Sequence, residues 1–461
     1  MMRSFLPGSR YMKKHWVGVL AFILGLSIGI DINDVPWAAG RIYQWIRNTI
    51  DSSGAASRDS ATADDAQVPD RGLWNVARGP NASVPDSAAA QKLKSIGYLG
   101  GYSPAKPFEN VTIYRREACF NGLNLYTSGH APEALLIDMS GKVLHRWQYD
   151  YEKALPGHLL PSTPSGTEHW RYARVMSNGD LLAIYEGQGL IKLDWNSKLI
   201  WALPIGAHHR LTLDRNGDIY VLTREVKLIP NIHPTEPVLE DFISIVSPEG
   251  VVKRDISLLS ALMNSPYRPL LDRMPPFGDL FHTNSLQILD GTLSSRSPAF
   301  AAGNVLVSLP LLDTIAIVDL NRESVVWSLS GQWRFQHTPM LLPNAHVLLF
   351  DNRGAEQRSR VLEVDPLTQE RTWLFGGTEE SPLYSEFNGA TQRLPNGNTL
   401  VTESGNGRGL EVNSAGQTVW EFYNPHRAGR RQELIATLFE IERVDADFLG
   451  SAIAPPGKSN D

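Results

Sequence analysis

The sequence predicts an all-β fold, a six-bladed β-propeller, preceded by an N-terminal transmembrane or signal-anchor helix. Three observations lead to this prediction. A unit of short strands separated by turns recurs six times from about residue 110. A tryptophan falls near the end of most of these units, and an uncharged apolar run follows several basic residues close to the N-terminus.

The composition is that of a globular protein with a large core. Of 461 residues, 42% are hydrophobic and 20% are charged, and the formal net charge is -6. No stripe of Lys and Arg recurs within the repeats, so we expect no nucleic-acid partner. Because Cys119 is the only cysteine, no disulfide can form within the chain.

The N-terminal segment has the pattern of an export signal. Basic residues precede an apolar run that extends from Trp16 to Ile30 without a charge. This order keeps the N-terminus in the cytoplasm and carries the rest of the chain across the membrane. The run is shorter than the about 20 residues of a full span, so a cleaved signal peptide is the alternative to an uncleaved anchor. We therefore expect a membrane-anchored protein whose propeller lies on the periplasmic or extracytoplasmic side.

The remaining chain divides by composition. Residues 52–90 are rich in Ser, Ala, Asp and Pro without an apolar period, which is typical of a solvated linker, and we assign no secondary structure there. The expected parts are a cytoplasmic basic segment (1–15), a transmembrane or signal-anchor segment (16–32), a juxtamembrane segment and flexible linker (33–95), the propeller (96–450) and a tail (451–461).

Each repeat contains a hairpin with an Asn-Gly-like turn. The turn asparagines are Asn178, Asn216, Asn344 and Asn396, in MSNGDLLAIY, LDRNGDIYVL, LPNAHVLLFD and LPNGNTLVTE. Five repeats then end in a tryptophan at one register, namely Trp147, Trp201, Trp327, Trp373 and Trp420. A tryptophan once per repeat favours packing between adjacent sheets. The C-terminal run 438–444 is one more strand, which we expect to close the ring against the first blade.

Three histidines fall at the start of innermost strands. Counting back seven residues from the turn asparagine gives His209 in one repeat and His337 in another, and His282 holds the same register in the fourth blade. Pseudo-rotational symmetry brings equivalent positions together around one axis, so these imidazoles should converge in the channel. Arg171 takes this register in the second blade. His208 should lie on the opposite face of its strand, because neighbouring strand residues alternate.

These motifs resemble those of the bacterial arylsulfotransferase (aryl-sulfate sulfotransferase) family of six-bladed propellers. The resemblance covers about residues 96–445. It rests on GLNLYTSGHAPEALLIDMSGKVLHRW, the histidine pair at 208 and 209, FHTNS at 281–285, QHTPMLLPNAHVLLFDN at 336–352 and QRLPNGNTLVTES at 392–404.

The resemblance implies an exported enzyme that moves a sulfuryl group from a phenolic sulfate to another phenol without a nucleotide donor. It implies that His337 is the nucleophile, and we expect His209 and His282 to stabilise the transferred group. Arg171 and Asn284 are the expected substrate-binding residues, and no metal or other cofactor is required. The partners would be small-molecule phenolic sulfates and phenols, together with the membrane through the N-terminal segment.

The sequence departs from the family pattern at one position. The family has an arginine after the strand that reads VLVSL, whereas this chain has Pro310. Proline cannot hold sulfate oxygens as a guanidinium does, and Arg171 is the candidate to supply the missing charge.

Two other functions remain open at this point. Three neutral imidazoles facing one axis are also a ligand set for zinc or iron, which would make the protein a metalloenzyme. Pro310 favours a third alternative, a propeller that binds ligands without turnover.

Overall fold

A computed structural model of the chain describes residues 74–78, 102–103, 105–158, 164–354, 358–445 and 447–449. The predicted basic segment, membrane anchor and C-terminal tail lie outside these residues. Within the described ranges, no helix is long and apolar enough to cross a membrane.

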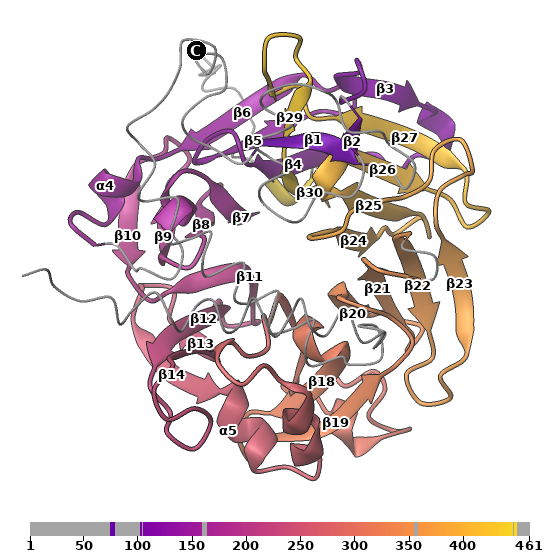
Figure 1. The fold of residues 1–461 in the computed structure, drawn as a ribbon. Coiled ribbons are helices and arrows are strands. Elements are labelled where there is room, and N and C mark those ends of the chain that lie inside the picture. Colours follow the sequence, from indigo (N-terminus) through magenta and orange to yellow (C-terminus); the bar gives the residue numbers. More distant parts are fainter. Residues whose placement is uncertain are drawn as a thin grey trace, which may run out of the picture. The chain divides into compact units, whose positions relative to one another are not determined.

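The described residues form six antiparallel blades around a central axis, which confirms the predicted propeller (Figure 1). The first blade contains β30 (Leu438–Val444), β4 (Leu123–Ser128), β5 (Glu133–Ile137) and β6 (Val143–Gln148), from the axis outward. The second contains β7 (Trp170–Val175), β8 (Leu181–Tyr185), β9 (Gly189–Leu193) and β10 (Leu199–Leu203). The third contains β11 (Ala207–Leu213), β12 (Ile219–Lys227), β13 (Val238–Val246) and β14 (Val252–Ser257), with β15 (Gly278–Asp279) parallel to β13.

The other three blades follow in chain order. The fourth contains β16 (Ser285–Ile288), β17 (Val305–Leu309), β18 (Thr314–Asp319) and β19 (Ser324–Ser330). The fifth contains β20 (His337–Leu341), β21 (Val347–Asp351), β22 (Arg360–Val364) and β23 (Arg371–Phe375). The sixth contains β24 (Ala390–Arg393), β25 (Thr399–Glu403), β26 (Arg408–Val412) and β27 (Thr418–Tyr423), and β3 (Asn110–Tyr114) adds a fifth strand outside β27.

Helices are short and lie between strands. Among the described residues, α4 (Tyr151–Ala154) and α5 (Leu258–Met263) are α-helices between strands. The 3₁₀ turns are η2 (Arg116–Ala118), η3 (Pro164–Thr167), η4 (Arg268–Arg273), η5 (Pro298–Phe300), η6 (Pro310–Leu312) and η8 (Ser404–Asn406). Helix α5 begins after Ser257, whose side chain accepts a hydrogen bond from the Ser260 N–H and so caps the helix.

How far each strand of a blade is buried depends on the two adjacent blades that cover its faces. Every residue of the middle strands β8 and β17 is buried, because both faces of these strands are covered by adjacent blades. The outermost strand β6 buries only Trp147 fully. The predicted hairpin turns are present, and glycines at positive φ, such as Gly179 at 85° and Gly397 at 87°, follow the turn asparagines.

Four of the five recurrent tryptophans contact the following blade, as predicted for packing between adjacent sheets. The indole N–H groups of Trp201, Trp373 and Trp420 donate to the carbonyls of Pro248, Ser414 and Met139 at 3.0, 3.1 and 2.9 Å. Each acceptor is the second residue of the turn between the two outer strands of the following blade. Trp147 meets Trp195 at the equivalent turn position, edge to face, with ring centroids 5.1 Å apart. Trp327 differs, because its ring packs against Phe300.

The last described strand closes the ring, which confirms the predicted role of residues 438–444. Strand β30 pairs antiparallel with β4 and becomes the innermost strand of the first blade. Arg443 of β30 lies between blades one and six: its Nη1 is 2.9 Å from Oε2 of Glu411, and its Nε donates to Oδ1 of Asn124 at 2.8 Å. Both side chains of the Arg443–Glu411 pair are fully buried.

A further four-stranded sheet lies beside the ring. It contains β2 (Tyr102–Ser103), β1 (Trp74–Arg78), β29 (Leu434–Ala436) and β28 (Arg427–Ala428). Strand β1 falls within the segment to which the sequence assigns no secondary structure. Its main pairing is with β29, more than 350 residues later, as in Trp74 opposite Ala436. Local composition carries no sign of a partner so distant in the chain.

Replacing Arg443 with methionine should destabilise the protein by about 3–5 kcal/mol, because Glu411 would remain buried without its cation. The free energy of unfolding in urea measures this loss. Converting Glu411 to glutamine in the same chain should recover part of it. Arg254→Met is the control, since its pair with Glu323 is half-exposed and should contribute less than about 1 kcal/mol.

Candidate functional site

The three predicted histidines lie in one cluster at the end of the channel where the innermost strands begin. His209 is the third residue of β11, His337 is the first of β20, and His282 precedes β16 by three residues. The rings of His209 and His282 are perpendicular, with centroids 4.9 Å apart. The Phe335 ring lies 6.1 Å from the rings of both His282 and His337. Three consecutive blades therefore contribute to one site.

The backbone at these strand starts departs from regular geometry. His209 and His282 both have φ near 53°, in the left-handed region that non-glycine residues seldom adopt. The ladder also shifts register between Ala207 and Leu211. The prediction that His208 lies on the opposite face is therefore wrong, because alternation fails where the strand is irregular. Nδ1 of His208 lies 2.8 Å from Nδ1 of His209.

The hydrogen bonds of Asn352 fix the tautomer of His337. Nδ2 of Asn352 donates to the carbonyls of Ser385 and Asn388 at 2.8 and 2.6 Å, so its Oδ1 is left to accept. That oxygen lies 2.7 Å from Nδ1 of His337, which must therefore carry the proton. Burial lowers the pKa of His337 to about 3, with Arg171 adding to the effect. At neutral pH the ring is uncharged and Nε2 has a free lone pair.

Asp279 orients His282 in the same manner. Its Oδ2 lies 2.6 Å from Nδ1 of His282, and its Oδ1 accepts from the His282 backbone N–H at 2.8 Å. Asp241 lies near Asp279, and its Oδ2 accepts a hydrogen bond from the backbone N–H of Thr283 at 2.8 Å. Burial, with Asp279 as the neighbouring charge, raises the pKa of Asp241 to about 7. Because Nδ1 of His282 is bound to Asp279, Nε2 is the ring nitrogen that remains for another partner.

Arg171 connects the two sides of the site. Its Nη2 donates to Oδ1 of Asn388 at 3.0 Å, and its Nε lies 3.7 Å from Oε2 of Glu186. Asn388 belongs to the sixth blade and is hydrogen-bonded to Asn352 through its carbonyl. On the other side, Glu186 lies 3.6 Å from Nδ1 of His209. Arg171 is therefore a buried cation beside both His209 and His337.

The charges in this cluster favour an anion over a metal ion. Glu186, His208 and His209 have donor atoms within 4.8 Å of one another, so they are a possible ligand set. However, the guanidinium groups of Arg171 and Arg224 lie 3.7 and 3.5 Å from the same carboxylate. Two fixed cations oppose the binding of a divalent cation there. The three histidines that the sequence singles out do not themselves form the candidate ligand set.

Asn284 and Pro310 have different surroundings from the three histidines. Asn284 donates through Nδ2 to the carbonyl of Gln336 at 2.9 Å, directly before His337. Its Oδ1 is buried without a hydrogen-bond partner among the described residues. Pro310 begins η6 after β17 and is buried, so this position supplies no cationic side chain. The guanidinium of Arg353 lies 4.7 Å from the centre of the Phe335 ring and 3.8 Å from Oε1 of Glu386.

A cavity of about 200 Å³ lies in the channel, lined by residues of all six innermost strands. Two ion pairs contribute to its wall, Arg210 with Glu440 at 2.6 Å and Arg174 with Glu442 at 2.9 Å. None of the three histidines lines it, but Thr338 does. The cavity is therefore next to the histidine cluster along β20 and distinct from it.

Several residues of the site were not predicted from the sequence. Asp279 and Asn352 set the tautomers, and Glu186 and Asn388 connect Arg171 to the histidines. Asn352 ends the QHTPMLLPNAHVLLFDN motif, and Asp279 precedes His282 by three residues, so both were close to residues already singled out. Glu186 and Asn388 lie in blades without a site histidine, and no local pattern marks them.

The low pKa of His337 predicts how stability depends on pH. A histidine in the unfolded chain binds a proton near pH 6.5, whereas folded His337 does so only near pH 3. Its contribution to stability is therefore complete above pH 6.5 and is lost as the pH falls toward 3, by up to about 1.4 kcal/mol per pH unit. As the pH falls from 7 to 5, the unfolding free energy of the wild type should decrease relative to that of His337→Asn. Urea titrations at each pH measure it, and an unchanged difference would contradict the low pKa.

Comparison with known proteins adds to this geometry. Among solved structures, a protein of unknown function from Bacteroides caccae is 12% identical, with a TM-score of 0.44, covering 70% of this chain and 98% of that one. A streptogramin B lyase is 11% identical with a TM-score of 0.41 (74% and 95% covered). The virginiamycin B lyase of Staphylococcus aureus is 11% identical with a TM-score of 0.38 (72% and 97% covered). TM-scores this low support no inference about function.

A search of curated proteins gave no significant match. The family model for arylsulfotransferase (ASST), in contrast, matches residues 173–425, more than half of the chain. The matched range contains four of the five predicted site residues, His209, His282, Asn284 and His337, and begins two residues after Arg171. The chain therefore belongs to the arylsulfotransferase family.

Proposed function

We propose that this protein transfers a sulfuryl group from an aryl sulfate to a phenolic acceptor through a sulfo-histidine intermediate on His337. The family implies arylsulfotransferase-type function and aryl sulfate substrates in general. The observation that carries the finer proposal is the hydrogen bond from Nδ1 of His337 to Asn352, because it leaves Nε2 unprotonated and available for attack.

The first half-reaction forms the S–N bond at Nε2 of His337 while the S–O bond to the donor phenol breaks. The departing phenolate keeps the electron pair of that bond and takes a proton from His282. In the second half-reaction the acceptor phenol attacks sulfur and gives its proton to His282, while the S–N electron pair returns to His337. Protons and electrons balance over the cycle, and His282 acts first as acid and then as base.

Arg171 is the residue that stabilises the negative charge of the transferring sulfuryl group in this proposal. A transferring sulfuryl group carries negative charge spread over its oxygens, so preorganised donors around it should lower the barrier most. Arg171 is buried beside both His209 and His337, and its position is fixed by Asn388 and Glu186. It can take the place of the family arginine that is Pro310 here. Phe335 offers an aromatic face to both His282 and His337, and Arg353 lies against the same phenyl ring.

Replacing His337 with asparagine should abolish transfer from a chromogenic aryl sulfate to a phenol while the far-ultraviolet circular dichroism stays unchanged. The relay through His337 should also give parallel lines in double-reciprocal plots of donor at several acceptor concentrations. His346→Asn is the matched control, because His346 pairs with Glu363 in a surface turn of the same blade. Intersecting lines, or wild-type turnover by His337→Asn, would refute the covalent mechanism.

Replacing Asp279 with asparagine should lower kcat by about 10²-fold, since general acid–base catalysis contributes on that order. It should also shift the pH dependence of kcat, because His282 would lose the carboxylate that holds its tautomer. A parallel loss at every pH would instead indicate a structural role for Asp279.

The location of the protein is a separate proposal, which rests on the sequence alone. The basic residues before Trp16 and the apolar run to Ile30 favour a membrane anchor with the propeller on the extracytoplasmic side. In intact cells, the propeller would then be cut by protease only after the outer compartment is opened.

A further inference from the structure

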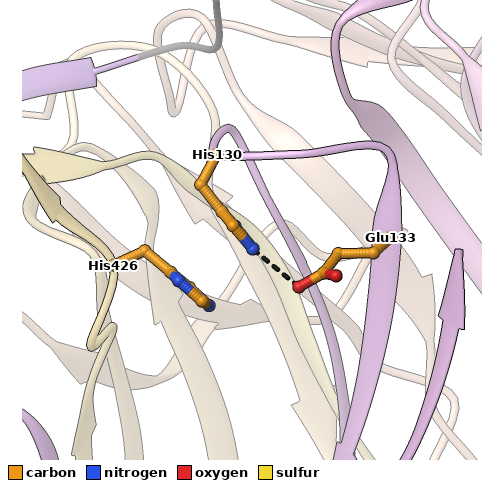
Figure 2. A group of neighbouring side chains, drawn as sticks. All are labelled: His130, Glu133 and His426. Carbon is orange, nitrogen blue, oxygen red and sulfur yellow. Dashed lines mark hydrogen bonds and ion pairs between the residues drawn. The ribbon is translucent and has the colours of Figure 1, made fainter. Parts of the chain in front are cut away.

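A second cluster of histidines lies outside the site described above, where the first blade meets the segment between β27 and β28. His130 is in the turn between β4 and β5, Glu133 is the first residue of β5, and His426 lies between β27 and β28 (Figure 2). One donor atom from each of the three side chains lies within 4.8 Å of the other two. The His130 and His426 rings are stacked, with centroids 3.3 Å apart and planes 9° apart. Segments from opposite ends of the propeller chain thus meet at one point.

Neighbouring groups direct one atom of each side chain into the cluster, where Nε2 of His130 and Oε1 of Glu133 are hydrogen-bonded to each other at 2.7 Å, a bond that a bound ion would replace. Ser128 Oγ lies 2.6 Å from Nδ1 of His130, which directs Nε2 of that ring toward Glu133. Arg146 donates to Oε2 of Glu133 at 2.9 Å, so that Oε1 faces His130. Nε2 of His426 is buried without a hydrogen-bond partner among the described residues. An unsatisfied buried nitrogen of this kind requires an explanation.

We propose that His130, Glu133 and His426 bind a divalent transition-metal ion of the zinc class. Two imidazole nitrogens and one carboxylate oxygen are a known zinc ligand set, with water in the fourth position. Ligand atoms of a tetrahedral zinc ion lie roughly 3.4 Å from one another. The 2.7 Å between Nε2 of His130 and Oε1 of Glu133 must therefore widen by about 0.7 Å, and the donors that lie up to 4.8 Å apart must approach by about 1.4 Å. Because the two rings are parallel, one of them must turn about its Cβ–Cγ bond to direct both lone pairs at one ion.

The surroundings supply what such a site needs. Ser128 and Arg146 are the outer hydrogen-bond partners that orient metal ligands. Arg146 is about half-exposed, so solvent screens its charge. The buried arginines of the channel cluster are screened less.

The site would strengthen the ring closure. The Gly129 N–H donates to the Thr437 carbonyl at 2.8 Å, and the Ala436 N–H donates to the His426 carbonyl at 3.1 Å. Thr437 directly precedes β30. A metal ion held by His130 and His426 would therefore tie the first blade to the segment that leads from the sixth blade into the closing strand.

The test uses the full-length protein, treated with chelator and then titrated with Zn²⁺ in a calorimeter and in thermal unfolding. We expect one equivalent to bind and the Tm to rise with Zn²⁺ concentration. Loss of an outer hydrogen-bond partner typically weakens metal binding by about 10–100-fold. His426→Ala, which removes a ligand, should weaken Zn²⁺ binding by more than this, and Ser128→Ala should weaken it by an amount within this range. Both readouts are independent of sulfuryl transfer, so failure of one proposal leaves the other standing.

The controls separate this site from others. His346→Ala removes a His–Glu pair that lacks a second histidine, and it should leave Zn²⁺ affinity unchanged. If His426→Ala fails to fold, Glu133→Gln tests the same site with a side chain of equal size. Equal affinity in wild type and both variants would overturn the proposal. So would binding that is lost in Glu186→Gln but kept in His426→Ala, since the ion would then belong to the channel.

Discussion

The pairing of β30 with β4 is the constraint on which the rest of the structure depends. The site takes Arg171 from the second blade, His209 from the third, His282 from the fourth, His337 from the fifth and Asn388 from the sixth. No two of these residues share a sheet. The distances between these side chains therefore depend on the angle between neighbouring blades. The closed ring and the tryptophan contacts between blades hold that angle constant.

Electrostatics within the ring distinguish the site from an ordinary polar channel. Burial keeps the pKa values of His208 and His337 near 3, so these imidazoles are uncharged, while Arg171 and Arg224 remain as cations. Glu186 balances part of that charge. Buried guanidinium groups favour an anionic ligand, and a neutral imidazole needs no deprotonation before it attacks, so this arrangement suits the proposed sulfuryl transfer.

Repetition made much of the fold predictable. The hairpin asparagines, the tryptophans and the closing strand each recur or complete a pattern, and the three histidines could be aligned because strand starts are equivalent across blades. What could not be predicted depends on contacts distant in the chain or on local irregularity. Asn388 reaches Arg171 across the site, β1 pairs with β29, and His208 turns toward His209 because the ladder shifts beside it. Alternation and composition carry no information on any of these.

The joint between the first and sixth blades is crossed by the chain twice. Strand β3 lies on the outer edge of the sixth blade before the chain enters β4, and the chain returns from β27 to β30 at the axis. Tension applied to the chain ahead of β1 is therefore borne first by the ladder between β1 and β29, and after that by the ladder between β3 and β27 at the outer edge of the sixth blade. Peeling that outer strand would leave β30 paired with β4. A propeller pulled from its N-terminal side can thus yield at its rim while the channel, and the residues at its mouth, keep their arrangement.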